Sequence, residues 1–169
     1  MKNVMWGVNL QGEKNNMNEQ LHDIVDVADW FLNKMSMRHK KLQKLCYYAV
    51  AWNYALLEKQ LCTRDEFMAW VHGPVNQVLF DKYRKFVWTP IPEVTETKNF
   101  GEESEEVLER VFETYGNLSG DDLESITHDE APWIKARGDL REHERSSEII
   151  KVEDMIQFYQ ELYALNQND

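Results

Sequence analysis

The segment 45–57 constrains the fold of this chain more than any other stretch. Every residue in it is aliphatic, aromatic or sulfur-containing, except Asn53. A helix that is apolar on all sides has to be buried on all sides. The run is shorter than the roughly 18 apolar residues that are needed to cross a bilayer. We therefore predict a buried central helix over about 37–60, capped by Ser36 and with Trp52 in the core, and no membrane contact.

Helical periodicity predicts about seven helices packed around this centre, so the expected fold class is all-α. The predicted ranges are 18–35, 64–70, 75–86, 104–115, 119–127, 132–137 and 152–166. Residues of the types that helix ends prefer stand at several of these boundaries: Asn18, the pairs Thr63–Glu66 and Ser119–Asp122, Gly116–Asn117 and Pro132.

The corner 70–75 follows the central helix. Gly73 and Pro74 are adjacent there and are the only glycine and proline between Glu13 and Thr89. Glycine permits a backbone conformation that other residues resist, and proline suits the first position of a helix. We predict a sharp turn at Gly73 and a new helix beginning at Pro74. The segment 88–94 contains two prolines and cannot be helical, so we predict a short strand there that pairs with 148–151.

Length and composition predict one domain over 18–166, preceded by an N-terminal extension over 1–17. The chain has 169 residues, including six Trp, seven Tyr and seven Phe, which is enough for a substantial core. Cys46 and Cys62 form neither a disulfide framework nor a zinc signature. No apolar signal segment is visible at the start of the sequence, so we expect a cytoplasmic protein.

Charge is distributed unevenly along the chain. The formal net charge is −11, and residues 93–130 contain thirteen acidic residues against only Lys98 and Arg110. Such a region repels nucleic acid and attracts a basic protein. The opposite patch, which we call the basic collar, consists of Arg38, Lys40, Lys41 and Lys44. Its residues are either a solvated helix start or a contact for an acidic partner.

The sequence contains no motif of a hydrolase, a nucleotide-binding loop or a dinucleotide-binding fold. We therefore predict no catalytic residues, no cofactor and no metal. One alternative stays open, because His72 and His128 could converge with Asp129 or Glu130 to bind a metal ion. The other interpretation of these histidines is that they fix a turn and a helix end by hydrogen bonds.

Four blocks of sequence, at 26–32, 42–49, 67–75 and 126–137, resemble the Panacea domain, the SocA-like antitoxin family of bacteria and phages. The resemblance covers roughly residues 21–163. The residues that it implies to be structural are Asp29, Trp30, Leu42, Gln43, Lys44, Leu45, Trp52, Gly73, Pro74, His128, Pro132, Trp133 and Arg137.

The resemblance implies a mainly helical, non-enzymatic antitoxin that neutralises a toxin by binding it, and it leaves the identity of the toxin open. One alternative is an adaptor that delivers the toxin to an ATP-dependent protease; another, from a different class, is a metal-dependent enzyme that uses His72 and His128. Nucleic acid is not an expected partner. The residues that we predict to contact the partner are Arg38, Lys41, Lys44, Tyr48, Trp70, His72, Glu102, Glu106 and Glu113.

Overall fold

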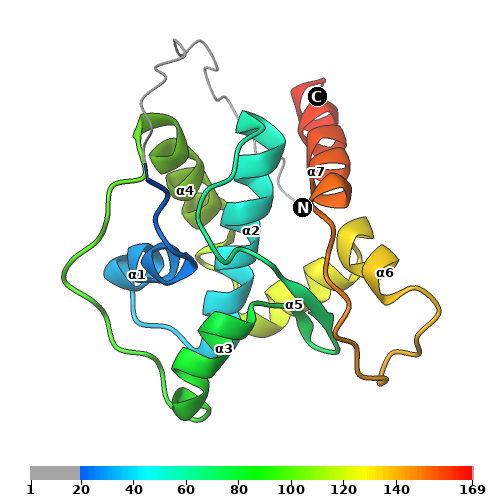
Figure 1. The fold of residues 1–169 in the computed structure, drawn as a ribbon, viewed down its shortest axis with the longest axis horizontal. Helices are drawn as coiled ribbons and strands as arrows, with labels where there is room; N and C mark the ends of the chain where they lie inside the picture. The colour runs from blue at the N-terminus through cyan, green and yellow to red at the C-terminus, as the bar shows by residue number, and fades with distance from the viewer. Residues whose placement is uncertain (1–19, 169) are drawn as a thin grey trace.

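The structure, a computed structural model, describes residues 20–168. Within this range it contains seven α-helices, a short 3-10 helix and one two-stranded sheet. The helix α2 (His39–Leu57) lies in the middle, with α1 and α4 on one side of it and α7 on the other (Figure 1). All residues from 42 to 53 are buried. The predicted fold class and the buried central helix are therefore confirmed.

The other elements follow in chain order and supply the neighbours that α2 needs. The helices are α1 (Ile24–Lys34), α3 (Gln77–Tyr83), η1 (Arg84–Phe86), α4 (Glu102–Tyr115), α5 (Gly120–His128), α6 (Ala131–Arg137) and α7 (Val152–Gln167). The strands are β1 (Met68–Trp70) and β2 (Gly73–Val75). No helix within residues 20–168 combines the length and the apolar character that crossing a membrane requires.

Some predicted helix boundaries are confirmed and others are wrong. Ser119 and Asp122 form the predicted capping box of α5, and Pro132 stands in the first turn of α6. Gly116 follows the last residue of α4, but it has φ −63° and does not adopt the left-handed conformation that glycine often takes at a helix end. The helix α2 begins after Arg38, because Ser36 instead donates a hydrogen bond to the Ile91 carbonyl (2.7 Å).

The helix α1 starts later than predicted. Asp23 caps it through a capping box with Asp26, so residues 20–23 precede the helix. They are held in an extended form because His22 and Ile24 exchange backbone hydrogen bonds with Thr63 (2.8 and 3.1 Å). The predicted cap Asn18 and the predicted extension 1–17 lie outside the described residues.

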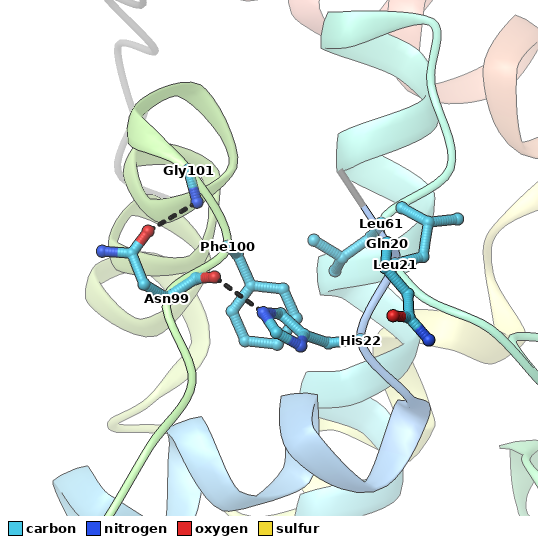
Figure 2. Close-up of a pocket in the computed structure, with 7 residues that line it drawn as sticks. All are labelled: Gln20, Leu21, His22, Leu61, Asn99, Phe100 and Gly101. Atoms are coloured by element: carbon cyan, nitrogen blue, oxygen red, sulfur yellow. Dashed lines mark hydrogen bonds between the residues drawn. The ribbon is translucent and has the colours of Figure 1, made fainter. Parts of the chain in front are cut away.

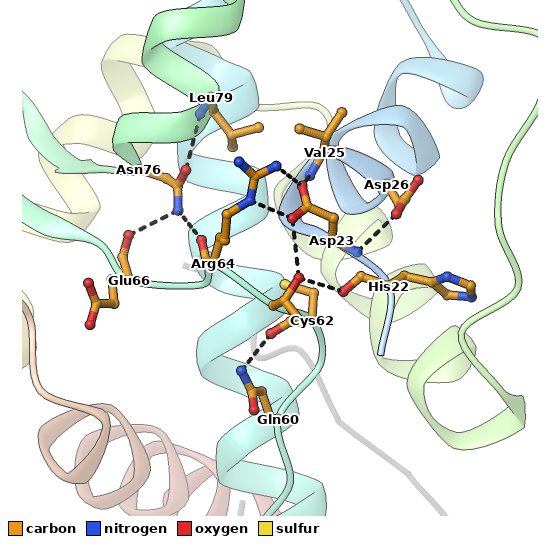
Figure 3. A network of polar contacts seen from close by, with 11 residues as sticks. His22, Asp23, Val25, Asp26, Gln60, Cys62, Arg64, Glu66, Asn76 and Leu79 are labelled. Atoms are coloured by element: carbon orange, nitrogen blue, oxygen red, sulfur yellow. Dashed lines mark hydrogen bonds and ion pairs between the residues drawn. The ribbon is translucent and has the colours of Figure 1, made fainter. Parts of the chain in front are cut away.

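The predicted helix 64–70 does not form. Arg64 has φ +53°, and its guanidinium makes two hydrogen bonds to the Asp23 carboxylate (2.6 and 2.8 Å; Figure 3). The Asn76 side chain donates to the carbonyls of Arg64 and Glu66 (2.8 and 2.9 Å), which a helix would use internally. The capping-box pattern at Thr63 and Glu66 is therefore overridden by contacts to residues far along the chain.

A β-hairpin occupies the predicted corner instead. Strands β1 and β2 are antiparallel, with Met68 opposite Val75 and Trp70 opposite Gly73. Pro74 lies in β2, and the next helix is capped by Asn76, whose side chain accepts from the Leu79 N–H (3.1 Å). A two-stranded element was expected, but its predicted residues are wrong. Segment 88–94 bridges to Met37 through Ile91, and Ile149 bridges to Met68.

The core contains a polar network in addition to its apolar residues. The Tyr48 hydroxyl donates to Glu130 (2.5 Å), and the Tyr159 hydroxyl is hydrogen-bonded to Glu130 and lies 3.3 Å from that of Tyr47. The rings of Tyr48 and Tyr115 stack at 4.0 Å. This network joins α2, α4, α6 and α7, and burial raises the pKa of Glu130 to about 7.

Replacing Trp52 tests the position of the core. Its side chain is fully buried, donates to the Tyr115 hydroxyl (3.2 Å) and lies 5.0 Å from the Tyr159 ring. We expect Trp52→Ala to lower the free energy of unfolding by about 3–5 kcal/mol, measured by urea denaturation. Trp88→Ala is the control, because Trp88 is 84% exposed and should change that free energy by about 0.5 kcal/mol or less. If the two variants lose equal amounts of stability, Trp52 does not lie in the core.

Replacing Glu130 tests the polar network. Its pKa rises from an ordinary 4.5 to about 7 on folding, so the folded state binds the proton more tightly. Stability from this group is complete below about pH 4.5 and is lost as the pH rises through about 7. We expect the unfolding free energy of Glu130→Gln, relative to wild type, to increase from about pH 5 to about pH 8.

Other titrating groups are common to both proteins and cancel in this comparison. Glu96→Gln is the matched control, since Glu96 is exposed and its substitution should leave the pH dependence of stability unchanged. A Glu130→Gln curve parallel to that of wild type would contradict the assignment.

Candidate functional site

The β-hairpin is held by buried side chains from α2. The Gln43 amide donates to the Asn76 carbonyl (3.0 Å) and accepts from the Asn76 N–H (2.8 Å). The Lys44 ammonium donates to the Pro74 carbonyl (3.1 Å). Backbone groups that are buried without a partner are costly. The adjacent residues Gln43 and Lys44 therefore satisfy the backbone at the end of β2.

Helices α5 and α6 hold the other strand and the turn. The Trp133 indole donates to the Trp70 carbonyl (2.9 Å), and Arg137 donates to the Ala69 carbonyl (3.0 Å). The His128 imidazole is hydrogen-bonded to the Val71 backbone and stacks on the Trp133 ring at 4.1 Å. We call the five side chains that bind the hairpin in this way the clamp: Gln43, Lys44, His128, Trp133 and Arg137.

Lys44 fits the hairpin closely at one point. Gly73 has φ +99°, and a Cβ atom there would lie 2.6 Å from Lys44 Cε. Both the backbone conformation and this contact require glycine. Burial lowers the pKa of Lys44 to about 7, while the nearby Glu124 carboxylate opposes that decrease. The clamp therefore includes a lysine that is fully buried, an arrangement that is rare for this residue type.

A groove lies beside the clamped hairpin. It has a volume of about 780 Å³ and runs between β1, the start of α3 and the loop 143–147. The rings of Trp70 and Phe80 meet edge to face at 5.0 Å within it. Its lining consists of Met68, Trp70, Val71, His72, Gln77, Phe80, His143, Arg145, Ser146 and Ser147.

Arg137 also fixes the loop that forms the far wall of the groove. One of its guanidinium nitrogens donates to the carbonyls of Arg141, Glu142 and Glu144 (2.9, 3.3 and 2.7 Å). The end of the loop is joined to β1, because the Ala69 N–H donates to the Glu148 carbonyl (2.9 Å). A single buried arginine thus ties together the two walls.

The structure brings two of the predicted contact residues together and separates the others. Trp70 and His72 both line the groove, and the exposed His72 is hydrogen-bonded to Glu124 (2.9 Å). Lys44 and Tyr48 are buried, which corrects the expectation that they face a partner. Their aliphatic and aromatic parts fill the core, and their polar ends are used by Pro74 and Glu130.

Most residues of the basic collar make contacts within the protein. Lys41 donates to the Gly116 carbonyl at the end of α4 (2.5 Å), where the helix dipole favours a cation. Lys40 forms ion pairs with Asp121 (2.7 Å) and Glu124 at the start of α5. Arg38 is exposed. Of this set, Arg38 alone keeps the exposure that we predicted for a contact surface.

The predicted acidic contact residues lie on α4. Glu102 and Glu113 are exposed and Glu106 is half-buried, while the apolar face of the helix packs on α2. Figure 1 shows α4 and the hairpin on different sides of α2. These three carboxylates are therefore separate from the groove.

The residues of the hypothetical metal site have other partners. His72 is hydrogen-bonded to Glu124, His128 is stacked on Trp133, and Glu130 accepts from Tyr48. Within residues 20–168, no three His, Cys, Asp or Glu side chains are grouped in a way that could hold a metal ion. The geometry thus favours the structural interpretation of both histidines.

A second, smaller cavity lies beside the first described residues. It has a volume of about 290 Å³. His22 and Phe100 both line it, and the centres of their rings lie 5.2 Å apart (Figure 2). The His22 imidazole is hydrogen-bonded to the Asn99 carbonyl (2.9 Å). These contacts connect the start of α1 to the segment before α4.

Sequence reasoning missed most of the groove. Gln77 and Phe80 are spaced three apart on α3, so their shared face was recognisable only once the neighbouring strand was known. His143 and Arg145 lie between the predicted helix 132–137 and the segment 148–151, where we predicted no contact residue. The clamp, in contrast, consists entirely of residues that the family resemblance singles out.

Comparison with known proteins agrees with this arrangement. A sequence model of the family described as antitoxin SocA-like, Panacea domain, matches residues 42–134, which is more than half of the chain. Curated proteins give no significant match, and neither do solved structures. The matched range includes the hairpin and all of the clamp except Arg137. The chain therefore belongs to the SocA-like antitoxin family and contains its Panacea domain.

Proposed function

We propose that this protein is an antitoxin that neutralises a toxin by binding it directly, without catalysing a reaction. The observation that carries the proposal is the match of residues 42–134 to the antitoxin family. We expect it to act in the cytoplasm, where toxins of such systems have their targets. The partner is a protein that is encoded together with this chain.

The exposed acidic face of α4 supports a basic partner. Glu103 and Glu109 are paired with Lys59 (3.1 Å) and Lys34 (2.6 Å). Glu113 is paired with Arg110 of the same helix (3.2 Å), whereas no ion pair within residues 20–168 involves Glu102 or Glu106. Surface pairs contribute little to stability, but unpaired surface carboxylates guide the approach of a basic protein.

The first experiment is co-expression with the neighbouring gene. We expect the neighbouring product to arrest growth when it is expressed alone, and this chain to restore growth and to co-purify with it. The proposal is wrong if a growth-arresting neighbour is neither bound nor neutralised by this chain.

Charge reversal on α4 tests the contact face. We expect Glu102→Lys with Glu106→Lys to slow association with the toxin by about tenfold at low salt, with a smaller effect at high salt, because electrostatic steering is screened. Stopped-flow or biosensor kinetics would measure this. The matched control is Glu96→Lys with Glu161→Lys, which makes the same change in net charge at exposed positions off α4. Equal slowing by both pairs would show that only net charge matters.

A proteolytic adaptor is the second candidate. An adaptor has to hold two proteins at once. Figure 1 shows α4 on a different side of α2 from the hairpin, and residues of the hairpin line the groove. The two candidates differ in the fate of the toxin. An adaptor shortens the lifetime of the toxin in cells that contain an ATP-dependent protease, whereas direct neutralisation leaves the toxin stable in the complex.

A further inference from the structure

The lining of the groove is basic, whereas the chain as a whole is acidic. The chain as a whole carries 30 acidic and 19 basic residues. The groove lining includes Arg145, His143 and His72 and contains no acidic residue. Two carboxylates outside the lining are hydrogen-bonded to lining residues, Glu124 to His72 (2.9 Å) and Asp81 to Gln77 (3.1 Å). The loop wall also contains the exposed Glu142, Glu144 and Glu148, which do not line the groove. Within the lining, Arg145 is therefore the residue with a permanent charge.

The opposite wall of the groove is apolar and aromatic. Trp70 and Phe80 are both only half-buried, and Met68 lies on the same face of β1 as Trp70. Tryptophan and arginine are the residue types that dominate binding energy at protein interfaces. The groove thus offers an apolar surface along one side and a cationic side chain along the other.

Both walls are held by hydrogen bonds from buried side chains of α6. Trp133 and Arg137 fix the carbonyls of β1, and Arg137 fixes three carbonyls of the loop. A preformed site loses little conformational entropy on binding. These hydrogen bonds are what a preorganised recognition site needs.

We propose that this groove binds an extended acidic segment of a partner protein, in which carboxylates alternate with apolar side chains. The apolar side chains pack on Trp70 and Phe80, and a carboxylate pairs with Arg145. Complementary charge selects this occupant. Resting on the proposed function, we assign the segment to the toxin, at a place separate from its contact with α4.

A direct test uses a short fluorescein-labelled peptide that alternates glutamate with phenylalanine and leucine. Its comparison probes are the same peptide with lysine in place of glutamate, and a labelled oligothymidine. We expect the full-length protein to bind the glutamate peptide at least about tenfold more tightly than either comparison probe, measured by fluorescence anisotropy. Preference for the lysine peptide, preference for oligothymidine, or no binding of the glutamate peptide would each overturn the proposal.

Two substitutions at exposed positions place negative charge in the groove. Gln77 is the first residue of α3, where an acid is favourable, although Gln77→Glu replaces the hydrogen bond to Asp81 (3.1 Å) with a like-charge pair on the surface of the helix. We expect Arg145→Glu and Gln77→Glu each to weaken binding of the glutamate peptide by about fivefold to tenfold. The matched control is Arg141→Glu, which reverses an exposed charge in the same loop but outside the lining. Equal loss in Arg141→Glu and Arg145→Glu would mean that the peptide responds only to net charge.

The same variants separate this proposal from the proposed function. If all of them neutralise the toxin and binding of the glutamate peptide is also unaffected, the groove proposal fails and the antitoxin function stands. If the peptide results hold but the neighbouring product is never bound, the antitoxin function fails and the groove proposal stands. Sedimentation velocity tests whether the groove instead binds a second copy of this chain. If the protein self-associates and Arg145→Glu abolishes the self-association, the occupant is a second copy and the proposal is overturned.

Discussion

The hairpin depends on hydrogen-bond donors that lie outside its two strands. Two strands of three residues make few backbone hydrogen bonds, and β2 is buried along its whole length. Four carbonyls, at positions 69, 70, 74 and 76, are satisfied by buried side chains of α2 and α6. An isolated hairpin of this size is marginal in water. Its stability therefore derives from the helices that surround it, and the groove exists because they hold the hairpin in one place.

This dependence explains why α2 combines an apolar body with a basic start. Cations near a helix N-terminus oppose its dipole, yet Lys41 and Lys44 donate to carbonyls of other elements, at Gly116 and Pro74. The unfavourable local charge is offset by contacts that α4 and the hairpin require. Burying Lys44 is costly unless it is hydrogen-bonded, and Gly73 allows the lysine to come close enough to reach Pro74.

Elements with local signals could be predicted from the sequence, and elements with distant partners could not. Three predicted features depend on residues within one or two turns: the cap of α5, the proline in the first turn of α6 and the apolar body of α2. The hairpin depends on Trp133 and Arg137, which are more than 60 positions away from the carbonyls that they bind. Lys44 was expected at the surface because lysine is seldom buried. The family resemblance identified the clamp residues, but only their geometry showed that they share one target.

The two walls of the groove differ in whether the family model covers them, and this bears on specificity. The hairpin and α3 lie within the range that matches the family, whereas the loop 139–147 lies beyond it. Arg137 holds that loop through backbone carbonyls alone. Side chains of the loop, including His143 and Arg145, can therefore change without loss of its position. Side chains that the fold does not need are free to set specificity, so we expect the loop wall to determine which partner the groove accepts.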